Sequence, residues 1–356
     1  MSEKVLMKGN EAIAEAAIIA GCRHYFGYPI TPQTEIAAYM AKRMPKIGGT
    51  FLQAESEIAA INMVYGVSAT GHRVMTSSSS PGISLKNEGI SYLAGADLPA
   101  LIVNVQRGGP GLGGIQPSQS DYFQATRGGG HGDYHMVVFA PASVQEMAAL
   151  TVKGFEVADK YRVTSMILAD GTMGQMMEPV DLASLKSDVT FEKPWATNGT
   201  KMQREHNIAN SLFLKPEQLE VTNYERFERY KAIEENEAMY EEYMMEDAEI
   251  VVAAFGIAAR VAKNAINEAR AEGIKVGMIR PITVWPFPVK PFEAAIGKAH
   301  TFISVELSMG QMIEDVKLAT QCRANYMLCN RVGGMIPSPE QFLASIKEAA
   351  KNGGAK

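Results

Sequence analysis

The residues best suited to chemistry lie in two short segments within the first 60 positions. Tyr28–Pro32 (YPITP) closes one predicted strand, and Gln53–Glu57 (QAESE) closes the next strand and opens a helix. In that helix Glu57 shares an apolar face with Ala60 and Ile61, because residues three and four apart lie on one side. A carboxylate on such a face is either paired or functional, since an unpaired buried charge is costly. A carboxyl group in apolar surroundings has a raised pKa and can share a proton with a ligand nitrogen.

Both candidate residues also fit ordinary structural roles. Thr31 precedes Pro32, and a hydroxyl residue followed by proline is typical of a helix start. Glu57 is an acid in a first helical turn, where the helix dipole favours negative charge. Glu55 lies two positions earlier and would project from another side of the helix, so it is the weaker candidate. The placement of Thr31 and Glu57 at matching strand ends favours one shared site.

Alternating helices and strands must position these residues. Predicted helices cover 10–21, 33–43, 55–70, 83–95 and 143–161, and predicted strands cover 24–28, 50–53, 73–77, 100–105, 136–140 and 164–169. Continuous apolar strands between helices indicate an α/β fold with a parallel sheet buried on both faces. Ligands of such sheets bind at the carboxyl ends of the strands. Thr31, Glu57, the serines 77–80 and Arg107 all fall at that edge.

Changes in composition divide the chain into three parts. The first α/β domain is expected over residues 1–185. Residues 186–247 form a charged connector, in which 217–245 is predicted to be helical. The alternation of strands and helices resumes at Ala248 and predicts a second, smaller α/β domain over 248–352.

Composition and charge exclude several classes of protein. The 356 residues carry a formal net charge of −5, and scattered Lys and Arg argue against a nucleic-acid-binding surface. The longest apolar runs, such as Ile250–Phe255, are too short to cross a membrane. Met1–Lys4 leads directly into an amphipathic pattern without the apolar core of a signal peptide. A cytoplasmic protein is therefore expected.

The cysteines limit what the chain can bind by itself. Cys22, Cys322 and Cys329 are its three cysteines, and no C-x-x-C pair occurs. An iron–sulfur cluster usually needs four thiolates, so this chain is not expected to hold one, and no zinc site is indicated. Electron transfer through such clusters would use another polypeptide.

Segments spread over almost the whole chain carry a resemblance to a known family. They are Gly27–Pro32, Gln53–Glu57, Ala60–Gly66, Gly82–Lys86, Val105–Arg107, the Gly108–Gly114 loop, Ser143–Glu146 and Val305–Gln311. The chain resembles the thiamin-diphosphate-dependent 2-oxoacid:ferredoxin oxidoreductases, and most closely the alpha subunits that act on 2-oxoisovalerate. Alpha subunits that act on 2-oxoglutarate are near relatives. The resemblance implies that 1–185 is a pyrimidine-binding domain and that 248–352 is similar to the transketolase C-terminal domain.

The resemblance also implies roles for the candidate residues. Glu57 matches the glutamate that hydrogen-bonds N1′ of the cofactor's aminopyrimidine and so promotes removal of the thiazolium C2 proton. Thr31 matches a threonine near the substrate carbonyl group, where it can act as a catalytic donor. Arg107 matches an arginine that holds the substrate carboxylate. Tyr28 and Pro29 are the other residues expected to contact the cofactor.

Two glycine-containing segments imitate other cofactor motifs. Gly109–Gly114 satisfies G-x-G-x-x-G, but Pro110 interrupts it and no helix is predicted to follow, so we interpret it as a flexible active-site loop. Asp170 and Gly171 are similar to part of the G-D-G motif that binds the metal of thiamin diphosphate, but Ala169 replaces the first glycine. We interpret that segment as an ordinary strand end and expect no metal-binding residue in this chain.

The protein implied by the resemblance is one subunit of a hetero-oligomer. It would oxidatively decarboxylate a branched-chain 2-oxo acid to an acyl-coenzyme A and pass electrons to ferredoxin. The pyrimidine half of thiamin diphosphate would bind here, and a beta subunit would hold the diphosphate and Mg²⁺. A gamma subunit and a ferredoxin-like delta subunit would complete the assembly, with 4Fe–4S clusters on other subunits. Alternatives are a subunit that acts on 2-oxoglutarate or pyruvate, a non-catalytic scaffold, and half of a non-oxidative decarboxylase.

Overall fold

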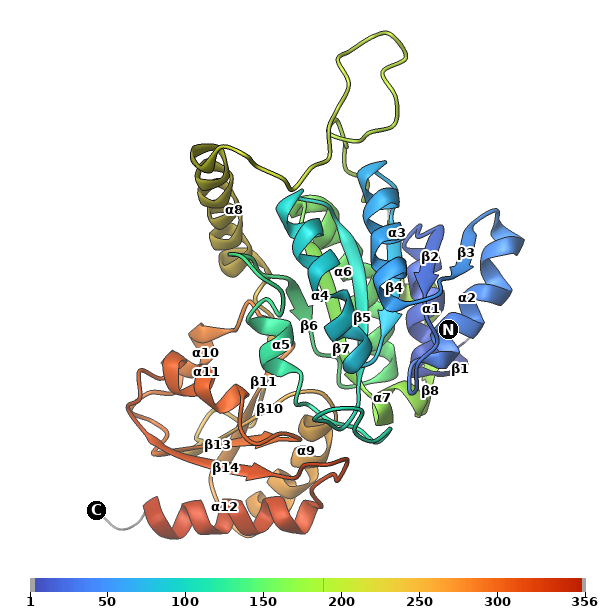
Figure 1. The fold of residues 1–356 in the computed structure, drawn as a ribbon. Coiled ribbons are helices and arrows are strands. Elements are labelled where there is room, and N and C mark those ends of the chain that lie inside the picture. The colour runs from blue at the N-terminus through green and yellow to red at the C-terminus, as the bar shows by residue number, and fades with distance from the viewer. Residues whose placement is uncertain (1–3, 188, 354–356) are drawn as a thin grey trace.

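Two mainly parallel sheets, each covered by helices, form the body of the protein (Figure 1). The structure, a computed structural model, describes residues 4–187 and 189–353. Residues 1–3, on which part of the signal-peptide argument rests, lie outside these ranges. The predicted α/β class is confirmed, because strands and helices alternate through both domains. Within the described ranges, no helix is both long and apolar enough to cross a membrane.

The larger sheet contains seven strands in the order β12-β6-β7-β5-β4-β2-β3. They are β2 (His24–Gly27), β3 (Thr50–Gln53), β4 (Val74–Ser78), β5 (Ala100–Gln106), β6 (Val137–Phe139), β7 (Thr164–Asp170) and β12 (Thr283–Trp285). The pairs are parallel, apart from the antiparallel pairing of β12 with β6. All residues of β4, β5 and β7 are buried, which explains why these strands are not amphipathic.

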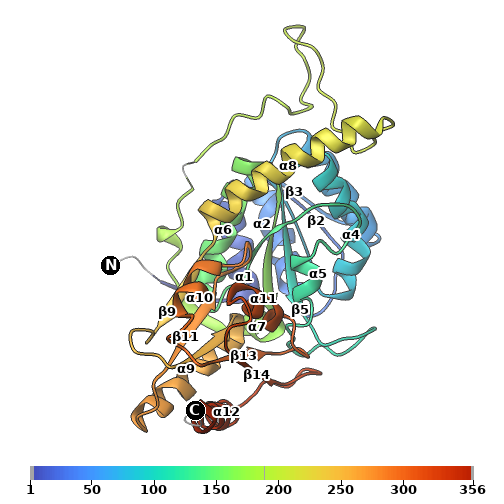
Figure 2. The same cartoon turned by 90° about the vertical axis from the view of Figure 1, so that its left-hand side faces the viewer.

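Helices cover both faces of this sheet (Figure 2). They are α1 (Gly9–Ile19), α2 (Thr34–Arg43), α3 (Glu57–Ala69), α4 (Pro81–Gly95), α5 (Tyr122–Thr126), α6 (Val144–Tyr161) and α7 (Gly171–Gln175), with the 3-10 helices η1 (Met44–Ile47) and η2 (Leu182–Ser184). Helix α1 packs against α2 and α6, whereas α3 packs against α4. A separate two-stranded sheet pairs β1 (Val5–Lys8) with β8 (Met177–Val180), and neither strand was predicted from the sequence.

The second domain is built on five strands in the order β14-β13-β10-β11-β9. Its elements are β9 (Tyr240–Tyr243), β10 (Ile250–Ala254), α9 (Gly256–Ala271), β11 (Val276–Pro281), α10 (Val289–Ala295), β13 (Thr301–Glu306), α11 (Met312–Ala319), β14 (Asn325–Asn330) and α12 (Pro339–Gly353). Helices α9 and α12 pack together, and α10 and α11 lie on the side that faces the first domain (Figure 1).

Strand pairing crosses the expected boundary between residues 247 and 248. Strand β9 lies within the expected connector but pairs antiparallel with β11 of the second domain. Strand β12 follows β11 in sequence but joins the larger sheet. The connector helix α8 (Pro216–Glu237) is therefore shorter than the predicted stretch 217–245, because tertiary pairing draws the last residues of that stretch into a strand.

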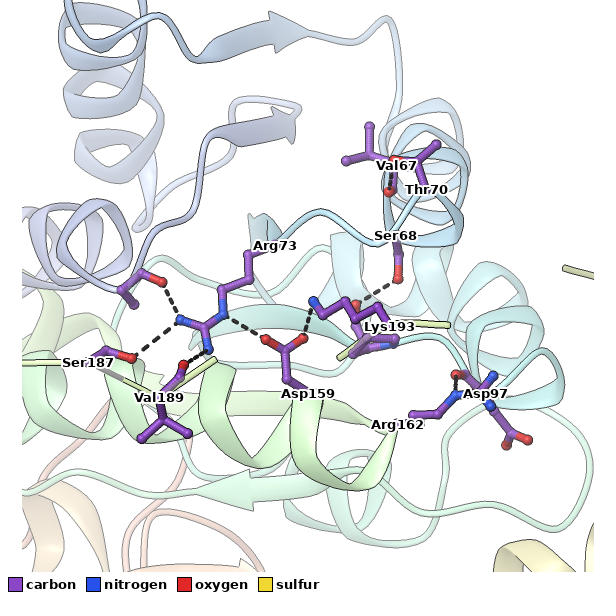
Figure 3. Close-up of polar contacts among 12 residues, drawn as sticks. Val67, Ser68, Thr70, Arg73, Asp97, Asp159, Arg162, Ser187, Val189 and Lys193 are labelled. Carbon is purple, nitrogen blue, oxygen red and sulfur yellow. Dashed lines mark hydrogen bonds and ion pairs between the residues drawn. The ribbon is translucent and has the colours of Figure 1, made fainter. Parts of the chain in front are cut away.

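The connector is attached to the first domain by a small network of polar contacts (Figure 3). Asp159 of α6 accepts a hydrogen bond from Arg73 Nε at 2.7 Å and another from Lys193 Nζ at 2.5 Å. Arg73 also donates to Ser187 Oγ and to the carbonyl oxygen of Val189, both at 3.3 Å. The start of the connector thus lies on the surface of the first domain, and the loop that precedes α8 extends away from the body in Figures 1 and 2.

Candidate active site

The carboxyl ends of four neighbouring strands bring the candidate residues to one edge of the larger sheet. In sheet order these strands are β5, β4, β2 and β3. Arg107 follows β5, Ser78–Ser80 lie at the end of β4, Thr31 lies after β2, and Glu57 opens α3 after β3. Because parallel neighbours end on the same side, these segments share the edge at which α/β proteins bind ligands.

Glu57 is buried at the first turn of α3. Ser56 caps this helix, since its Oγ accepts a hydrogen bond from the backbone N–H of Ala59 at 3.1 Å. Glu57 is 5% exposed, whereas Glu55 is an exposed residue. Glu57 is therefore almost completely covered by the protein.

Two glycines of α4 allow that helix to approach Glu57 closely. A Cβ atom added to Gly82 would lie 2.8 Å from Glu57 Oε1 and 2.1 Å from Ser78 Oγ. A Cβ atom added to Gly89 would lie 2.4 Å from Cγ2 of Ile61. Any side chain at these positions would push α3 and α4 apart. The glycines therefore allow α4 to pack directly against α3 at Glu57 and Ile61.

Several polar groups on β4, on α4 and after β5 are buried without a hydrogen-bond partner. They are Thr76 Oγ1, Ser78 Oγ, Ser79 Oγ, Lys86 Nζ and Arg107 Nε. Most buried polar groups in native proteins are paired, so an unpaired group needs an explanation. Burial lowers the pKa of Lys86 to about 8, and the negative charge of Glu57 opposes that shift. Unpaired groups beside a carboxylate, together with a perturbed pKa, are typical of a ligand site.

Arg107 is held by backbone carbonyl groups at this edge. Its Nη1 donates to the carbonyl oxygen of Thr31 and its Nη2 to that of Leu112, both at 3.0 Å. Its backbone N–H donates to Ser80 Oγ, also at 3.0 Å. Thr31 is exposed, and its carbonyl group ties it directly to Arg107. The structure thus places Thr31 in hydrogen-bond contact with Arg107, while Glu57 lies where α3 and α4 pack together.

Asp121 and Ser80 form a polar cluster beside Arg107. Ser80 Oγ donates to Asp121 Oδ2 at 2.6 Å, and Asn104 Nδ2 donates to the same oxygen at 2.9 Å. Burial raises the pKa of Asp121, and these two hydrogen bonds oppose the shift. The backbone φ angle of Ser80 is 21°, a value that residues other than glycine rarely adopt. Such strained backbone angles are common at functional sites. Sequence reasoning missed Asp121, because it lies in a loop outside every recognised motif.

A pocket of about 670 Å³ opens beside Arg107, between the two domains. Its lining includes Ser80, Arg107 and Asp121 from the first domain, and Leu307, Met309 and Val332 from the second. Among the described residues that line it, Arg107 is the one cation and Asp121 the one anion. The glycine loop contributes Gly108–Gly111 to one wall, and no helix follows that loop directly. The loop therefore belongs to a pocket and not to a dinucleotide-binding turn.

Glu306, at the end of β13, shapes the wall that the second domain contributes. It is 0% exposed. Its carboxylate accepts hydrogen bonds at 2.7–3.0 Å from the hydroxyls of Ser304 and Ser308 and from the backbone N–H groups of Gln311, Met312 and Ile313. These bonds fix the turn before α11, and Gln311 then donates to the carbonyl oxygen of Ser120 at 2.8 Å. This hydrogen bond ties the pocket wall to the first domain.

Other residues singled out in the sequence lie at the same edge with different surroundings. Tyr28 is 37% exposed, and Pro29 is also exposed. Asp170 caps α7, since its Oδ1 accepts from the backbone N–H groups of Thr172 at 2.8 Å and Met173 at 3.1 Å. Among the residues that the structure describes, no cluster of three or more His, Cys, Asp or Glu side chains is placed to hold a metal ion.

Comparisons with known proteins define the class to which this fold and site belong. A family model described as pyruvate flavodoxin/ferredoxin oxidoreductase, thiamine diphosphate-binding, matches residues 15–246. A second model, pyruvate:ferredoxin oxidoreductase core domain II, matches residues 248–342. The two matches place the chain among thiamin-diphosphate-binding oxidoreductases. The chain belongs to the 2-oxoacid:ferredoxin oxidoreductase family, as its motifs predicted.

Individual relatives support this assignment. The chain is 53% identical to ketoisovalerate oxidoreductase subunit VorB of Methanothermobacter marburgensis, over 97% of both chains. It is 35% identical to 2-oxoglutarate synthase subunit KorA of Methanothermobacter thermautotrophicus, over 97% of this chain and 99% of that one.

Solved structures confirm the predicted fold class. A 2-oxoglutarate:ferredoxin oxidoreductase from Magnetococcus marinus superposes with a TM-score of 0.85 and 28% identity, covering 98% of this chain and 65% of that chain. A split-gene transketolase in an inactive beta4 tetramer superposes with a TM-score of 0.61. It is 13% identical over 97% of this chain and 98% of that chain, which shows likeness of fold alone.

Proposed function

We propose that this chain is the subunit of a 2-oxoacid:ferredoxin oxidoreductase that binds the pyrimidine half of thiamin diphosphate and acts on a branched-chain 2-oxo acid. The observation that carries this proposal is the buried carboxylate of Glu57, which faces the glycine side of α4. It lies at the carboxyl edge of a parallel sheet in a domain whose family binds this cofactor. The 53% identity to a ketoisovalerate oxidoreductase subunit favours a branched-chain substrate.

Glu57 is the residue that we assign to the aminopyrimidine ring. A ring nitrogen needs a carboxyl partner, and Glu57 supplies one; the absence of a side chain at Gly82 lets α4 lie directly against Glu57 and Ser78. The unpaired hydroxyl groups of Ser78 and Ser79 are available to further polar atoms of a ligand. Glu57 would hold the proton at N1′, and Tyr28 and Pro29 would contact the ring from the exposed side. When bound, thiamin diphosphate supplies the electron sink that decarboxylation of a 2-oxo acid requires.

The pocket beside Arg107 suits a small carboxylate with an apolar chain. We assign the substrate carboxylate to the guanidinium group of Arg107, whose Nε lacks a partner. The hydroxyl of Thr31 would donate to the substrate carbonyl oxygen, where negative charge develops. Leu307, Met309 and Val332 form an apolar wall opposite. A second cation for the distal carboxylate of 2-oxoglutarate is missing among the described lining residues, which favours a branched aliphatic chain.

The remaining cofactors are assigned to partner chains. We place the diphosphate and Mg²⁺ on a beta subunit and the 4Fe–4S clusters on other subunits, with gamma and ferredoxin-like delta subunits completing the complex. Support comes from the relatives, which are named as subunits, and from the three cysteines, which are too few for a cluster. Coenzyme A and ferredoxin would act as the acceptors of the acyl group and of the electrons. A cytoplasmic location is part of the same proposal.

Reconstitution with the partner subunits tests the proposal. With coenzyme A and ferredoxin present, kcat/KM is expected to be highest for 2-oxoisovalerate, lower for 2-oxoglutarate and pyruvate, and lost in Glu57→Ala. A preference for 2-oxoglutarate would overturn the substrate assignment. Full activity of Glu57→Ala would favour a scaffold, and aldehyde release without an electron acceptor would favour a non-oxidative decarboxylase.

A further inference from the structure

Lys86 is a buried lysine that none of the roles above employs. It is 0% exposed on α4, and its Nζ has no hydrogen-bond partner. Lysine is almost never fully buried unless it is paired, because removing the ammonium group from water is costly. A methionine would fill the same volume without that cost. The charge of Lys86 therefore needs an explanation.

Helical geometry places Lys86 in the contact between α3 and α4. It lies four residues after Gly82 and three before Gly89, so the three residues share one face of α4. That face packs against α3, with Gly82 beside Glu57 and Gly89 beside Ile61. A long helical side chain leans toward the N-terminus of its own helix, which directs Lys86 toward the turn of Gly82.

Glu57 is the charged group that acts on Lys86. Burial lowers the pKa of Lys86 to about 8, and Glu57 is the charge that opposes this effect. Other charged groups at the same edge have different surroundings. Glu55 is exposed, Arg107 donates to backbone carbonyl groups, and Asp121 accepts from two neutral side chains. The side chains at the end of β4, which also lie beside Gly82, are neutral serines.

We propose that Lys86 is a positioning residue that acts through Glu57. Its buried ammonium group is the counter-charge beside Glu57 that orients this side chain toward the cofactor's pyrimidine. The inference rests on the proposed function and adds to it a residue that touches neither the substrate nor the reacting atoms.

The experiment uses the complete reconstituted complex. Affinity for thiamin diphosphate, with Mg²⁺ present, is measured by titration calorimetry at neutral pH. The variants are Glu57→Gln, Lys86→Met and Lys86→Arg, with Lys42→Met as the control, because Lys42 is exposed on α2. Glu57→Gln measures how much of that affinity depends on the Glu57 carboxylate. Lys86→Gln replaces Lys86→Met should the methionine variant not assemble.

Lys86→Met is expected to lower the affinity for thiamin diphosphate about tenfold, because the Glu57 carboxylate loses the cation that orients it. Lys86→Arg keeps the charge and should restore most of this affinity, and Lys42→Met should leave the affinity unchanged. Unchanged affinity in Lys86→Met overturns the role of Lys86 but leaves the proposed function standing. Unchanged affinity and unchanged turnover in Glu57→Gln overturn the proposed function itself.

Discussion

Glu57 in the first domain and Glu306 in the second are both buried glutamates, yet their surroundings differ. Glu306 is 0% exposed, and its carboxylate accepts hydrogen bonds from two serine hydroxyls and three backbone N–H groups of its own chain. Glu57 is 5% exposed, and polar atoms near it, Ser78 Oγ and Lys86 Nζ, lack partners. One carboxylate is satisfied by its own chain, and the other lies among groups that are not.

The difference separates a structural carboxylate from one that is prepared for a ligand. The carboxylate of Glu306 accepts hydrogen bonds from the turn before α11 and so holds the pocket wall in place. Around Glu57 several buried polar groups have no partner, which destabilises the folded state. A ligand with complementary polar atoms would pair with these groups and remove that free-energy cost. Stability should therefore depend most on Glu306, and catalysis most on Glu57.

Replacement of Glu57 should have the largest effect of all on turnover. Glu57→Gln is expected to lower kcat of the reconstituted complex by roughly 10²- to 10⁴-fold, the range for loss of a positioned acid–base group. The matched control is Glu55→Gln, two positions away and exposed, which should leave kcat within a factor of about two, because surface substitutions are usually small in effect. Equal losses in the two variants would contradict the assignment of Glu57.

Replacement of Glu306 should show the opposite pattern. Glu306→Gln puts an amide N–H among groups that already donate, and should lower the free energy of unfolding by roughly 2–3 kcal/mol. Urea unfolding measures this loss, with Glu57→Gln as the comparison, and that variant should unfold at a urea concentration close to that of the unmodified chain. A greater loss of stability in Glu57→Gln would break the distinction between the two carboxylates.

Replacement of Arg107 should affect substrate binding more than the cofactor. Arg107→Gln is expected to raise KM for the 2-oxo acid about tenfold, since a charge-assisted hydrogen bond contributes about 1.5 kcal/mol or more. Affinity for thiamin diphosphate, measured by titration calorimetry, should stay nearly constant. A variant with normal KM but weakened cofactor binding would move Arg107 from the substrate to the cofactor.

A substitution at Gly82 should have the smallest effect, and it tests how closely α4 packs against Glu57. In Gly82→Ala the new methyl group would collide with Ser78 Oγ and press on Glu57 Oε1, so cofactor affinity should fall. Gly66→Ala on α3 is the control, because an added Cβ atom there has no neighbour within 4 Å. It should raise the free energy of unfolding by about 0.5–1 kcal/mol through helix propensity alone. Normal cofactor affinity in Gly82→Ala would show that close packing of α4 against Glu57 is not needed for cofactor binding.

The pattern of residues was sufficient to predict the fold class and the sheet edge that holds the candidate residues. Apolar strands that alternate with helices indicate a parallel sheet, and the carboxyl ends of its strands lie at one edge. Thr31, Glu57 and Arg107 could therefore be placed at that edge from the sequence alone. Motifs spread over the chain were specific enough to identify the family, since they span both domains. The roles of these residues stay predictions, because a motif does not show what a side chain contacts.

Tertiary structure alone decided which further residues belong to the site. In sequence, Lys86 is one lysine on a helix, and its burial depends on the close approach of α3 at Gly82 and Gly89. Asp121 meets Ser80 across a separation of 41 residues, and β9 and β12 find their partners on strands far away or in the other domain. Such contacts depend on pairing between distant segments, and local periodicity carries no information about distant partners.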